Sequence, residues 1–491
     1  MKILLVEPRT PETFWSLRHA LPFVGRRAAN PPLGLLTVAG LLPRHWDCRL
    51  VDLNAAELHD RDLAWCDYVM ISGMVIHRDA VARLVARAHA ACRPVIGGGP
   101  LFGAGAESDD LGVDHVVEGE AEEIMPRLVA DLEAGRPAPR YVATRFPDLA
   151  LTPAPRWDLV DIDHYATLSV QSCRGCPFDC EFCDVVALNG RKPRYKPADR
   201  FIAELEDLRR RGWCGPVFVV DDNFVGHRRR CRQLLEAMIA WRRRTGARMT
   251  FLTEASVDMA GDEQLLELMV AAGFKKVFVG LETPSAASLR ECRKTQNLRG
   301  DLGEAVRTIQ RAGLEVMGGF IVGFDSDEPD IFQRQFEFIQ RSGVVTAMVG
   351  LLQALPRSRL YQRLAGEGRL RASSGGDNTS ADLNFEPRLD REFLVENYRR
   401  LMRRLYEPDC YYQRIRTFLD THAARGPREP VTRRDVAALL RSIWLMGIVH
   451  PGRRAYWRLL AFTVVRRPRQ LSVAVTLAIM GHHFRQVSAG L

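Results

Sequence analysis

Short apolar runs alternate with helical patterns along the first 140 residues of the chain. The apolar runs have the length of strands, and the segments between them carry apolar residues at helical spacing. Short strands separated by helices indicate a parallel sheet covered on both faces. Residues 1–140 are therefore predicted to form a Rossmann-like α/β domain. Its strands are expected at Ile3–Val6, Cys48–Leu53, Tyr68–Ser72, Pro94–Gly97 and His115–Glu118, and its helices at Leu35–Leu42, Asp79–Ala91 and Ala121–Leu132.

A proline-rich stretch, residues 141–166, separates this region from a second alternating one. The stretch is predicted to be a linker, because proline interrupts both helices and strands. Residues 167–385 then carry six strand–helix units, which favours a partial (β/α)6 barrel with its chemistry at the carboxyl ends of the strands. The strands are expected at residues 167–171, Val217–Val220, Met249–Thr253, Lys276–Leu281, Glu315–Val322 and Thr346–Leu352, and the helices at Ala198–Arg211, Arg229–Arg243, Glu263–Ala272, Asp301–Ala312 and Glu328–Arg341.

The last region, residues 386–491, is predicted to be a helical domain rich in arginine and aromatic residues. Its most apolar run, Leu471–Met480, has about half of the ~20 residues that a membrane-spanning helix needs. No transmembrane helix is therefore predicted. Basic residues beside aromatic ones on helices favour contact with a membrane surface, a nucleic-acid stripe, or a solvated cap over the barrel.

The net charge of +9 is unevenly distributed along the chain. Residues 391–491 contain 19 Arg and seven acidic residues, a surplus of 12 positive charges. From Val436 onward there are eight Arg and no acidic residue. This asymmetry indicates an anionic partner for the last region and says nothing about the fold.

The cysteine usage and the amino terminus favour a reducing, cytoplasmic location. The 11 cysteines are odd in number and scattered, which is not typical of a disulfide framework. Residues 1–7 form an apolar run that is too short for the core of a secretory signal.

Three cysteines, Cys176, Cys180 and Cys183, follow the first barrel strand at CxxxCxxC spacing. Crowded thiolates suit a soft metal centre. A structural zinc site needs four ligands, usually as two separated pairs, and no second pair follows. Three thiolates suit a [4Fe-4S] cluster that keeps one iron open. Cys173 is expected not to be a ligand.

This motif, with the aromatic Phe182 before its last cysteine, resembles the signature of radical S-adenosylmethionine (SAM) enzymes. In that family the three cysteines hold the cluster and form the catalytic centre, and the aromatic residue packs near the adenine. The amino and carboxylate groups of SAM bind the open iron. Electron transfer then splits SAM into methionine and a 5′-deoxyadenosyl radical.

Polar and glycine residues at the strand ends of the barrel match further SAM contacts of that family. Each acidic residue among them also has a simpler interpretation, as the N-cap of the next helix. The resemblance implies that SAM is bound by Phe182, Asp222, Asn223, Glu254, Glu282, Gly319, Ile321 and Gly323. Three basic residues after the cluster loop either neutralise the SAM carboxylate or solvate a loop: Lys192, Arg194 and Lys196.

The first domain resembles the cobalamin-binding domain found ahead of many radical SAM domains. A corrin would lie on the glycine-rich strand ends, because only residues without side chains allow such close approach. The DxHxxG motif that supplies a cobalt-ligating histidine in other cobalamin proteins is absent, so cobalamin is expected to bind without it. His77 is expected to have a surface role. The implied cobalamin contacts are Ser72, Gly73, Gly97, Gly98, Gly99 and Glu118.

The whole pattern looks most like the cobalamin-type radical SAM group with a helical C-terminal domain, which includes the bacterial hopanoid C-2 methylase. The resemblance implies methyl transfer to an unactivated carbon of a small molecule or a membrane lipid. One SAM would methylate the cobalamin, and a second would give the radical that removes hydrogen from the substrate. A reducing donor such as flavodoxin or ferredoxin is an implied partner, and nucleic acid is not expected. Peripheral contact with the inner membrane face is expected through Trp444, Trp457, Phe462 and residues 471–480.

Two alternatives remain open from the sequence. The first is a radical SAM enzyme that cyclises, rearranges or methylthiolates its substrate. Methylthiotransferases carry three more N-terminal cysteines, but Cys48, Cys66 and Cys92 are expected to be buried small hydrophobic residues. The second is a non-catalytic metal-binding module on nucleic acid, with zinc in the cysteine loop.

Overall fold

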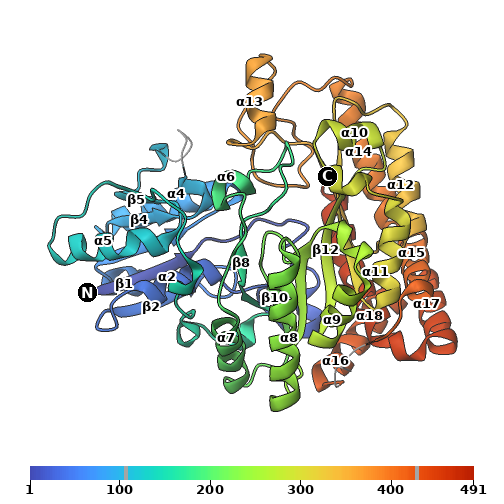
Figure 1. The fold of residues 1–491 in the computed structure, drawn as a ribbon, viewed down its shortest axis with the longest axis horizontal. Helices are drawn as coiled ribbons and strands as arrows, with labels where there is room; N and C mark the ends of the chain where they lie inside the picture. The colour runs from blue at the N-terminus through green and yellow to red at the C-terminus, as the bar shows by residue number, and fades with distance from the viewer. Residues whose placement is uncertain (104–108, 426–430) are drawn as a thin grey trace.

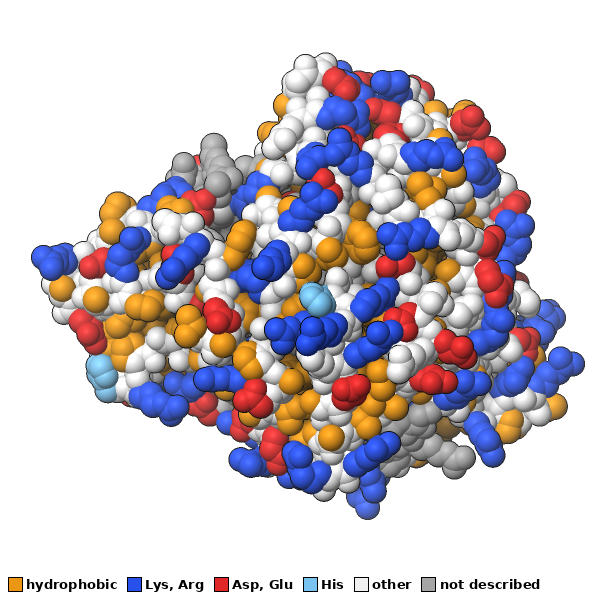
Figure 2. All heavy atoms as spheres, in the orientation of Figure 1, with side chains coloured by type: hydrophobic (Ala, Val, Ile, Leu, Met, Phe, Trp, Pro, Cys, Tyr) orange, Lys and Arg blue, Asp and Glu red, His pale blue; other side chains and the backbone are white. Residues whose placement is uncertain are grey.

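The computed structural model describes residues 1–103, 109–425 and 431–491. An α/β domain, an open barrel and a helical domain follow one another along the chain, as predicted. Figure 1 shows the first domain in blue beside the barrel, with the carboxyl-terminal helices packed on the other side of the barrel. On the face drawn in Figure 2, positive and negative side chains are interleaved, so the excess of positive charge does not form one continuous patch there.

The first domain is a six-stranded parallel sheet of order β2-β1-β3-β4-β5-β6. Separate apolar clusters cover its two faces. The strand order reverses beside β1, and ligands of such sheets bind at the carboxyl ends next to that point. Its strands are β1 (Lys2–Glu7), β2 (Asp47–Asp52), β3 (Tyr68–Ser72), β4 (Val95–Gly98), β5 (His115–Glu118) and β6 (Arg140–Val142), and its helices are α2 (Leu33–Leu41), α3 (Asp60–Trp65), α4 (Arg78–Ala90) and α5 (Ala121–Glu133).

The sixth strand, β6, is not predicted from the sequence. It pairs with β5 and extends the sheet to Val142, inside the proline-rich stretch. The rest of that stretch is fixed to the first domain by hydrogen bonds. The Tyr165 hydroxyl donates to Asp52 at 3.0 Å, and the Thr152 hydroxyl donates to Glu122 at 2.8 Å. The linker is therefore a packed strap between the two domains.

The barrel is an open parallel sheet of order β14-β13-β12-β11-β10-β7, with β7 and β14 at its two edges. Its six strands and the helices between them agree with the predicted alternation to within a few residues. The strands are β7 (Leu168–Val170), β10 (Pro216–Val219), β11 (Thr250–Ala255), β12 (Phe274–Glu282), β13 (Glu315–Val322) and β14 (Ala347–Leu351), and the helices are α7 (Ala198–Arg210), α8 (Arg228–Thr245), α9 (Glu263–Ala272), α11 (Leu302–Ala312) and α12 (Ile331–Ser342).

Several short elements have no clear periodicity in the sequence. A two-stranded antiparallel hairpin, β8 (Cys173–Arg174) with β9 (Arg194–Tyr195), closes the base of the cysteine loop. The other short elements are helices: α1 (Leu21–Val24), α6 (Val185–Asn189), α10 (Ala286–Glu291) and α13 (Arg359–Gly366).

The carboxyl-terminal helices pack on α12 and on β14 of the barrel. Within the described ranges, no helix is both long enough and apolar enough to cross a membrane. The expected contact of residues 471–480 with a membrane is wrong, because Ala474, Leu477 and Ala478 are buried among the other helices. The helices are α14 (Arg391–Tyr406), α15 (Pro408–Thr421), α16 (Arg433–Ser442), the π-helix η9 (Ile443–Val449), α17 (Arg453–Arg466) and α18 (Leu471–Ala489).

Candidate functional site

The cysteine loop leaves β7 through the β8–β9 hairpin and lies at the carboxyl ends of the barrel strands. Gly175, just before the first cysteine, has φ +98, and a Cβ there would lie 2.8 Å from the Gly190 carbonyl oxygen. The sharp turn into the loop therefore requires glycine. The Cys176 amide donates to Gly190 O at 3.2 Å, and the Cys183 amide donates to Cys180 O at 3.2 Å. These bonds give the loop a defined shape.

The three thiols of the loop are partly buried and interact with one another. Burial raises the pKa of Cys176 and of Cys180, and it raises the pKa of Cys183 to about 12. A charge on Cys180 also raises the pKa of its two neighbours. Without a metal the thiols are protonated at neutral pH, and metal binding would release their protons. Across the described residues, no set of three His, Cys, Asp or Glu side chains has the arrangement that holds a single metal ion.

Two buried amides face the cysteine sulfurs, and neither is fully paired. Asn223 Nδ2 lies 3.9 Å from Cys176 Sγ, and Gln296 Nε2 lies 3.8 Å from Cys180 Sγ. The other amide atoms, Asn223 Oδ1 and Gln296 Oε1, are buried without a hydrogen-bond partner among the described residues. Buried acceptors of this kind are costly unless something donates to them. A cluster and a SAM amino group at this site would fit such a set of donors and acceptors.

The two aspartates after β10 hold the loop in place. Asp221 accepts hydrogen bonds from the amides of Ser172 and Cys173 at 2.7 and 2.9 Å. Asp222 accepts from the Gly175 amide at 2.6 Å and from Asn189 Nδ2 at 3.0 Å. Burial raises the pKa of Asp221 to about 7 and raises that of Asp222. Asp222, predicted as a SAM contact, is thus committed to the loop backbone, whereas Asn223 faces the cysteines.

The two predicted glutamates lie at the ends of the next strands. No described residue donates a hydrogen bond to the Glu254 carboxylate. Burial, followed by the charges of Asp222 and Asp221, raises the pKa of Glu254 to about 7. The buried Glu282 carboxylate instead accepts from Lys294 Nζ at 2.6 Å. Glu254 is therefore the glutamate that is available to a ligand.

Lys294 was not predicted as a site residue, although its side chain contacts two residues that were, Glu282 and Phe182. Its ammonium group lies 5.7 Å from the centre of the Phe182 ring. Burial lowers the pKa of Lys294, but Glu282 and Cys180 raise it by more, so the side chain is held charged. The Lys294, Gln296 and Asn297 side chains follow α10 without any periodic signal, and only the local Lys-Thr-Gln-Asn run marks them.

The predicted GxIxG strand is β13. A Cβ at Gly319 would lie 2.8 Å from the Phe278 ring, so the strand approaches its neighbour closely there. Gly323 has φ +102 and donates its amide to Asp327 at 2.8 Å. Ile321 is partly exposed, whereas the other residues of β13 are buried. Phe324, just beyond the strand, lies 6.3 Å from Phe182 between ring centres.

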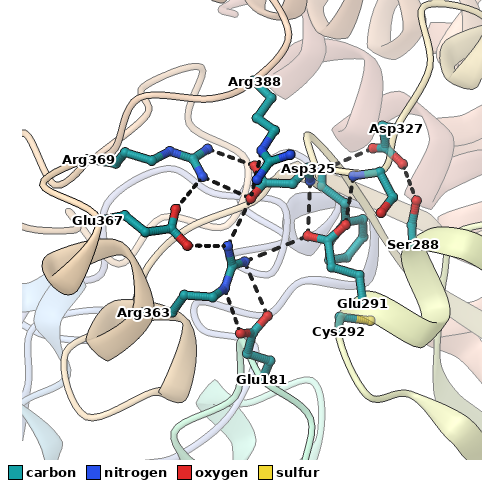
Figure 3. Close-up of polar contacts among 12 residues, drawn as sticks. Glu181, Ser288, Glu291, Cys292, Asp325, Asp327, Arg363, Glu367, Arg369 and Arg388 are labelled. Atoms are coloured by element: carbon teal, nitrogen blue, oxygen red, sulfur yellow. Dashed lines mark hydrogen bonds and ion pairs between the residues drawn. The ribbon is translucent and has the colours of Figure 1, made fainter.

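Arg363 of α13 fastens the cysteine loop to the end of β13 (Figure 3). It bonds to Glu181, which directly follows Cys180, at 2.8 Å, and to Asp325 at 2.9 Å. Burial raises the pKa of Asp325, but hydrogen bonds from Arg369 and Arg363 outweigh it and lower the pKa. The loop is therefore anchored on one side by the β10 aspartates and on the other by this network.

The predicted cobalamin contacts lie together at the carboxyl ends of β3, β4 and β5. The Gly73 amide donates to Gly98 O at 3.1 Å. Gly99 has φ +89, and a Cβ there would lie 2.8 Å from Ser72 Oγ. Gly98 is different, because its nearest neighbour would be Val117 at 3.7 Å. Among the described residues, nothing lies closer than this to the Cβ position of Gly98, which would fit a flat ligand at this glycine edge. The structure places Glu118 in an ion pair with Arg140 at 3.1 Å.

Ion pairs join this strand-end region to the cysteine loop. Glu120 and Glu122, at the start of α5, accept hydrogen bonds from Arg174 of β8. Glu120 also binds Arg194 of β9. The Arg174 side chain is 14% exposed and that of Glu122 is 2% exposed. The two domains therefore meet through buried charges, directly beside the base of the cysteine loop.

Two expectations about side chains outside the site are wrong. His77 is not at the surface: it is 2% exposed, and its ring lies 3.1 Å from the Thr10 hydroxyl. The three N-terminal cysteines are not all buried, because Cys92 is exposed and Cys48 is only partly buried. Cys66 and Cys48 pack in the apolar clusters on opposite faces of the sheet. These three cysteines therefore do not form one metal site.

The alternatives for the basic residues after the loop are partly resolved. Lys196 is buried and bonds to Glu204, and Arg194 bonds to Glu120. Both therefore have structural partners. Lys192 is exposed. Cys173 is fully buried, and burial raises the pKa of its thiol.

Comparison with known proteins matches each part of the chain to a family model. Residues 26–129 match the B12 binding domain, residues 170–339 match the radical SAM superfamily, and residues 358–490 match a domain of unknown function (DUF4070). An uncharacterized methyltransferase of Synechocystis sp. is 38% identical over 99% of this chain and 92% of its own length. The hopanoid C-2 methylase of Rhodopseudomonas palustris is 33% identical over 100% of this chain and 94% of its own length.

A solved structure shares the fold. The radical SAM methyltransferase TsrM from Kitasatospora setae, with cobalamin and a [4Fe-4S] cluster bound, has a TM-score of 0.61 and 16% sequence identity, covering 76% of each chain. The domains and the cysteine loop define a radical SAM enzyme with a cobalamin-binding domain. The chain belongs to the family of cobalamin-dependent radical SAM methyltransferases. The predicted cofactors, a [4Fe-4S] cluster, SAM and cobalamin, are those of this family.

Proposed function

We propose that this enzyme transfers a methyl group to an unactivated carbon at the junction between the two domains. The ion pairs of Glu120 and Glu122 with Arg174 carry the proposal, because they hold the glycine strand ends beside the cysteine loop. When bound, the cofactors supply the radical that removes a hydrogen atom and the methyl group that replaces it. The protein contributes by holding both parts of the site in fixed positions and by excluding water.

Each part of the site has a proposed role in this reaction. Cys176, Cys180 and Cys183 hold the cluster, and Asn223 and Gln296 donate toward two of their sulfurs. Glu254 and Asn223 Oδ1 accept from SAM, and Phe182 packs against its adenine. Gly98 and its neighbours lie under the corrin, where no histidine of a DxHxxG motif is present.

Alanine substitution of single cysteines tests the proposed ligand set. Replacing Cys176, Cys180 or Cys183 is expected to abolish the brown absorbance of the anaerobically reconstituted protein and its production of 5′-deoxyadenosine. Cys173→Ala is the matched control, because this thiol is buried in the base of the same loop. Retention of the cluster in Cys176→Ala together with its loss in Cys173→Ala would overturn the assignment.

We further propose that the methyl acceptor is a membrane lipid such as a hopanoid. The relative from Rhodopseudomonas palustris is named a hopanoid C-2 methylase, and it aligns over the whole of this chain. A polycyclic lipid is barely soluble, so an enzyme acting on it has to work at a membrane surface. Incubation with SAM labelled in its methyl group, cobalamin and a hopanoid in vesicles tests this; a methylated hopanoid is expected, and its absence beside turnover of another acceptor would contradict it.

An apolar face on the carboxyl-terminal domain supports membrane contact. Nine of the 14 exposed large hydrophobic residues of the described chain fall within residues 431–465, so they are concentrated on one domain. Four of them recur at four-residue intervals along α16 and η9, which places them along one side of that helix. Three more lie on α17, which packs against η9. We call these seven residues the apolar face: Val436, Leu440, Trp444, Ile448, Trp457, Val464 and Val465.

Exposed arginines flank the apolar face. Arg453, Arg454, Arg458 and Arg466 of α17 are all exposed. A helix with an apolar side and arginines beside it lies in the plane of a membrane surface. Each arginine near an acidic lipid surface contributes about 1 kcal/mol. Of the residues expected to touch the membrane, Trp444 and Trp457 lie on this face, whereas Phe462 is only partly exposed.

The apolar face lies away from the strand-end site. Figure 1 shows α16 at the bottom of the molecule and α10 and α13, which follow barrel strands, at the top. Membrane contact through this face would therefore hold the enzyme at the membrane, and an acceptor lipid would have to leave the bilayer to reach the cofactor end of the barrel.

Flotation with liposomes tests the proposed membrane contact. Wild-type protein is expected to float with anionic liposomes at low salt and to be released as salt rises. Replacing Arg453, Arg454 and Arg458 with Glu, or Trp444 and Val465 with Ser, is expected to reduce flotation several-fold. The matched control replaces Arg229, Arg230 and Arg243 with Glu, since these are exposed arginines of α8. Equal flotation of all variants, or tight RNA binding without flotation, would contradict the proposal.

A further inference from the structure

Three arginines surround one aspartate on the outer side of the cysteine loop. Asp179 lies between Cys176 and Cys180 in the sequence. Its carboxylate is 2.8 Å from Arg359, 3.8 Å from Arg191 and 3.9 Å from Arg293, measured to the guanidinium nitrogens. We call these four residues the Asp179 ring. The arginines come from α13, from the segment after α6 and from the segment after α10, so three separate parts of the chain meet over the loop.

The Asp179 ring is exposed and carries a net positive charge. The side chains of Arg191, Arg293 and Arg359 are 61%, 55% and 48% exposed, whereas that of Asp179 is 21% exposed. One carboxylate balances only one of the three cations. Lys192, beside Arg191, is also exposed. The outer surface of the loop therefore presents several cations to solvent.

Stability of the loop does not account for all three arginines. An exposed ion pair contributes about 0–1 kcal/mol, and less when the groups are nearly 4 Å apart. Arg359 alone is at hydrogen-bonding distance from Asp179. The loop is already fixed by Asp221, Asp222 and the Glu181–Arg363 pair. Arg191 and Arg293 thus have little structural function in the loop and remain available to a partner.

We infer that the Asp179 ring is the docking surface for an acidic one-electron carrier protein. The inference rests on the proposed function, because a cluster in this loop has to receive an electron from outside before SAM is cleaved. The step moves one electron from the reduced carrier, which is oxidised by one electron, to the [4Fe-4S]²⁺ cluster, which becomes [4Fe-4S]⁺. No covalent bond forms or breaks in this step.

The charge and the position of the ring both suit this partner. Opposite charges steer a carrier to its site and raise the association rate at low ionic strength. Electron-transfer complexes are short-lived and bury little surface, so a few exposed charges are enough to orient them. Asp179 directly precedes Cys180, so a carrier seated on it would contact the same loop that holds the cluster.

Reduction kinetics with two different donors test the inference. The test variant is Arg191→Glu with Arg293→Glu, which leaves Arg359 paired with Asp179. Reconstituted protein is mixed with flavodoxin hydroquinone, and bleaching of the cluster is followed by stopped flow. The variant is expected to be reduced at least ten-fold more slowly than wild type at low salt. With titanium(III) citrate, a small reductant that needs no docking surface, the two are expected to be reduced at the same rate.

A binding measurement gives a readout that does not depend on turnover. Oxidised flavodoxin is expected to bind the wild-type holoenzyme more tightly than the variant in fluorescence anisotropy, and the difference is expected to shrink as salt rises. Arg229→Glu with Arg230→Glu on α8 makes the same change of charge elsewhere and is expected to behave like wild type.

The possible outcomes separate this inference from the proposed function. Equal slowing with both donors would show that the arginines maintain the loop, and equal rates for variant and wild type with flavodoxin would place the carrier elsewhere. Either result overturns the inference while the proposed function stands. Absence of SAM cleavage in wild-type protein reduced by titanium(III) citrate would instead overturn the proposed function, whatever the binding data show.

Discussion

At the scale of single residues, Glu282 is one of five non-glycine residues in the described chain with a positive φ. This residue has φ 62, in the left-handed region that non-glycine residues rarely adopt, and it is 5% exposed. A Cβ at Gly280 would lie 2.3 Å from its carboxylate, so a side chain at position 280 would displace the Glu282 carboxylate. Lys294 binds the carboxylate at 2.6 Å. Strain of this kind persists where the surroundings fix a residue for function, which marks the Glu282–Lys294 pair as part of the site.

Glu254 is expected to make the stability of the cofactor-free protein depend on pH. Its pKa rises from 4.5 to about 7 on folding, so between these values the folded state holds a proton that the unfolded state has lost. Stability contributed by this group is present below pH 4.5 and is lost as the pH rises through 7, on the order of 3 kcal/mol. Glu254→Gln is expected to remove this part of the decline in urea unfolding between pH 5 and pH 8. A decline of unchanged size in Glu254→Gln would contradict the assignment.

The sequence predicts the residues of the site better than their individual roles. Asp222 and Asn223 are adjacent at the end of one strand, yet one carboxylate is used by the backbone of Gly175 while the other side chain faces Cys176. Such a division depends on the direction of each side chain at the strand end, which spacing does not determine. Lys294 cannot be predicted from spacing either, because it lies in an irregular segment after a short helix.

At the scale of elements, periodicity predicts the long strands and helices and misses the short ones. β13 and α9 have the predicted bounds. β6 has three residues and lies among prolines, so it shows no alternation. The apolar run of α18 has a composition that is also found in helices that lie on a membrane surface, but neighbouring helices bury it. Composition alone does not distinguish a helix buried by protein from one that contacts lipid.

Substitution of Gly98 tests the role of the β4 end. A Cβ at Gly97 would collide with the Phe102 ring at 2.5 Å, and Gly99 has a positive φ, so changes at either position would disturb the fold. Gly98 has room, with Val117 at 3.7 Å. Gly98→Leu is therefore expected to leave the iron content unchanged and to weaken cobalamin binding by at least ten-fold, about 1.4 kcal/mol. Gly366→Leu on α13 is the control, since nothing lies near it. Cobalamin retention equal to wild type would place the corrin elsewhere.

At the scale of the whole molecule, the proposed catalytic site and the proposed membrane-contacting face lie at different ends. The first domain and the strand ends of the barrel together form the proposed site. Buried ion pairs of Glu120 and Glu122 fix the positions of these two parts relative to each other. Breaking one partner of such a buried pair costs about 3–5 kcal/mol. Glu122→Ala is therefore expected to lower the thermal midpoint and to uncouple SAM cleavage from methyl transfer. Normal coupling of the two in a stable Glu122→Ala protein would show that this junction does not align them.

Cofactor content and label transfer, measured on one anaerobic sample, test the central claim most directly. Protein reconstituted with iron, sulfide and cobalamin is analysed for metals and then supplied with SAM labelled in its methyl group and with a hopanoid acceptor. About four irons per chain, as expected for a single [4Fe-4S] cluster, together with one cobalamin and the label on a carbon of the acceptor, is the predicted result. Zinc without iron, or about eight irons and label on sulfur, would contradict it.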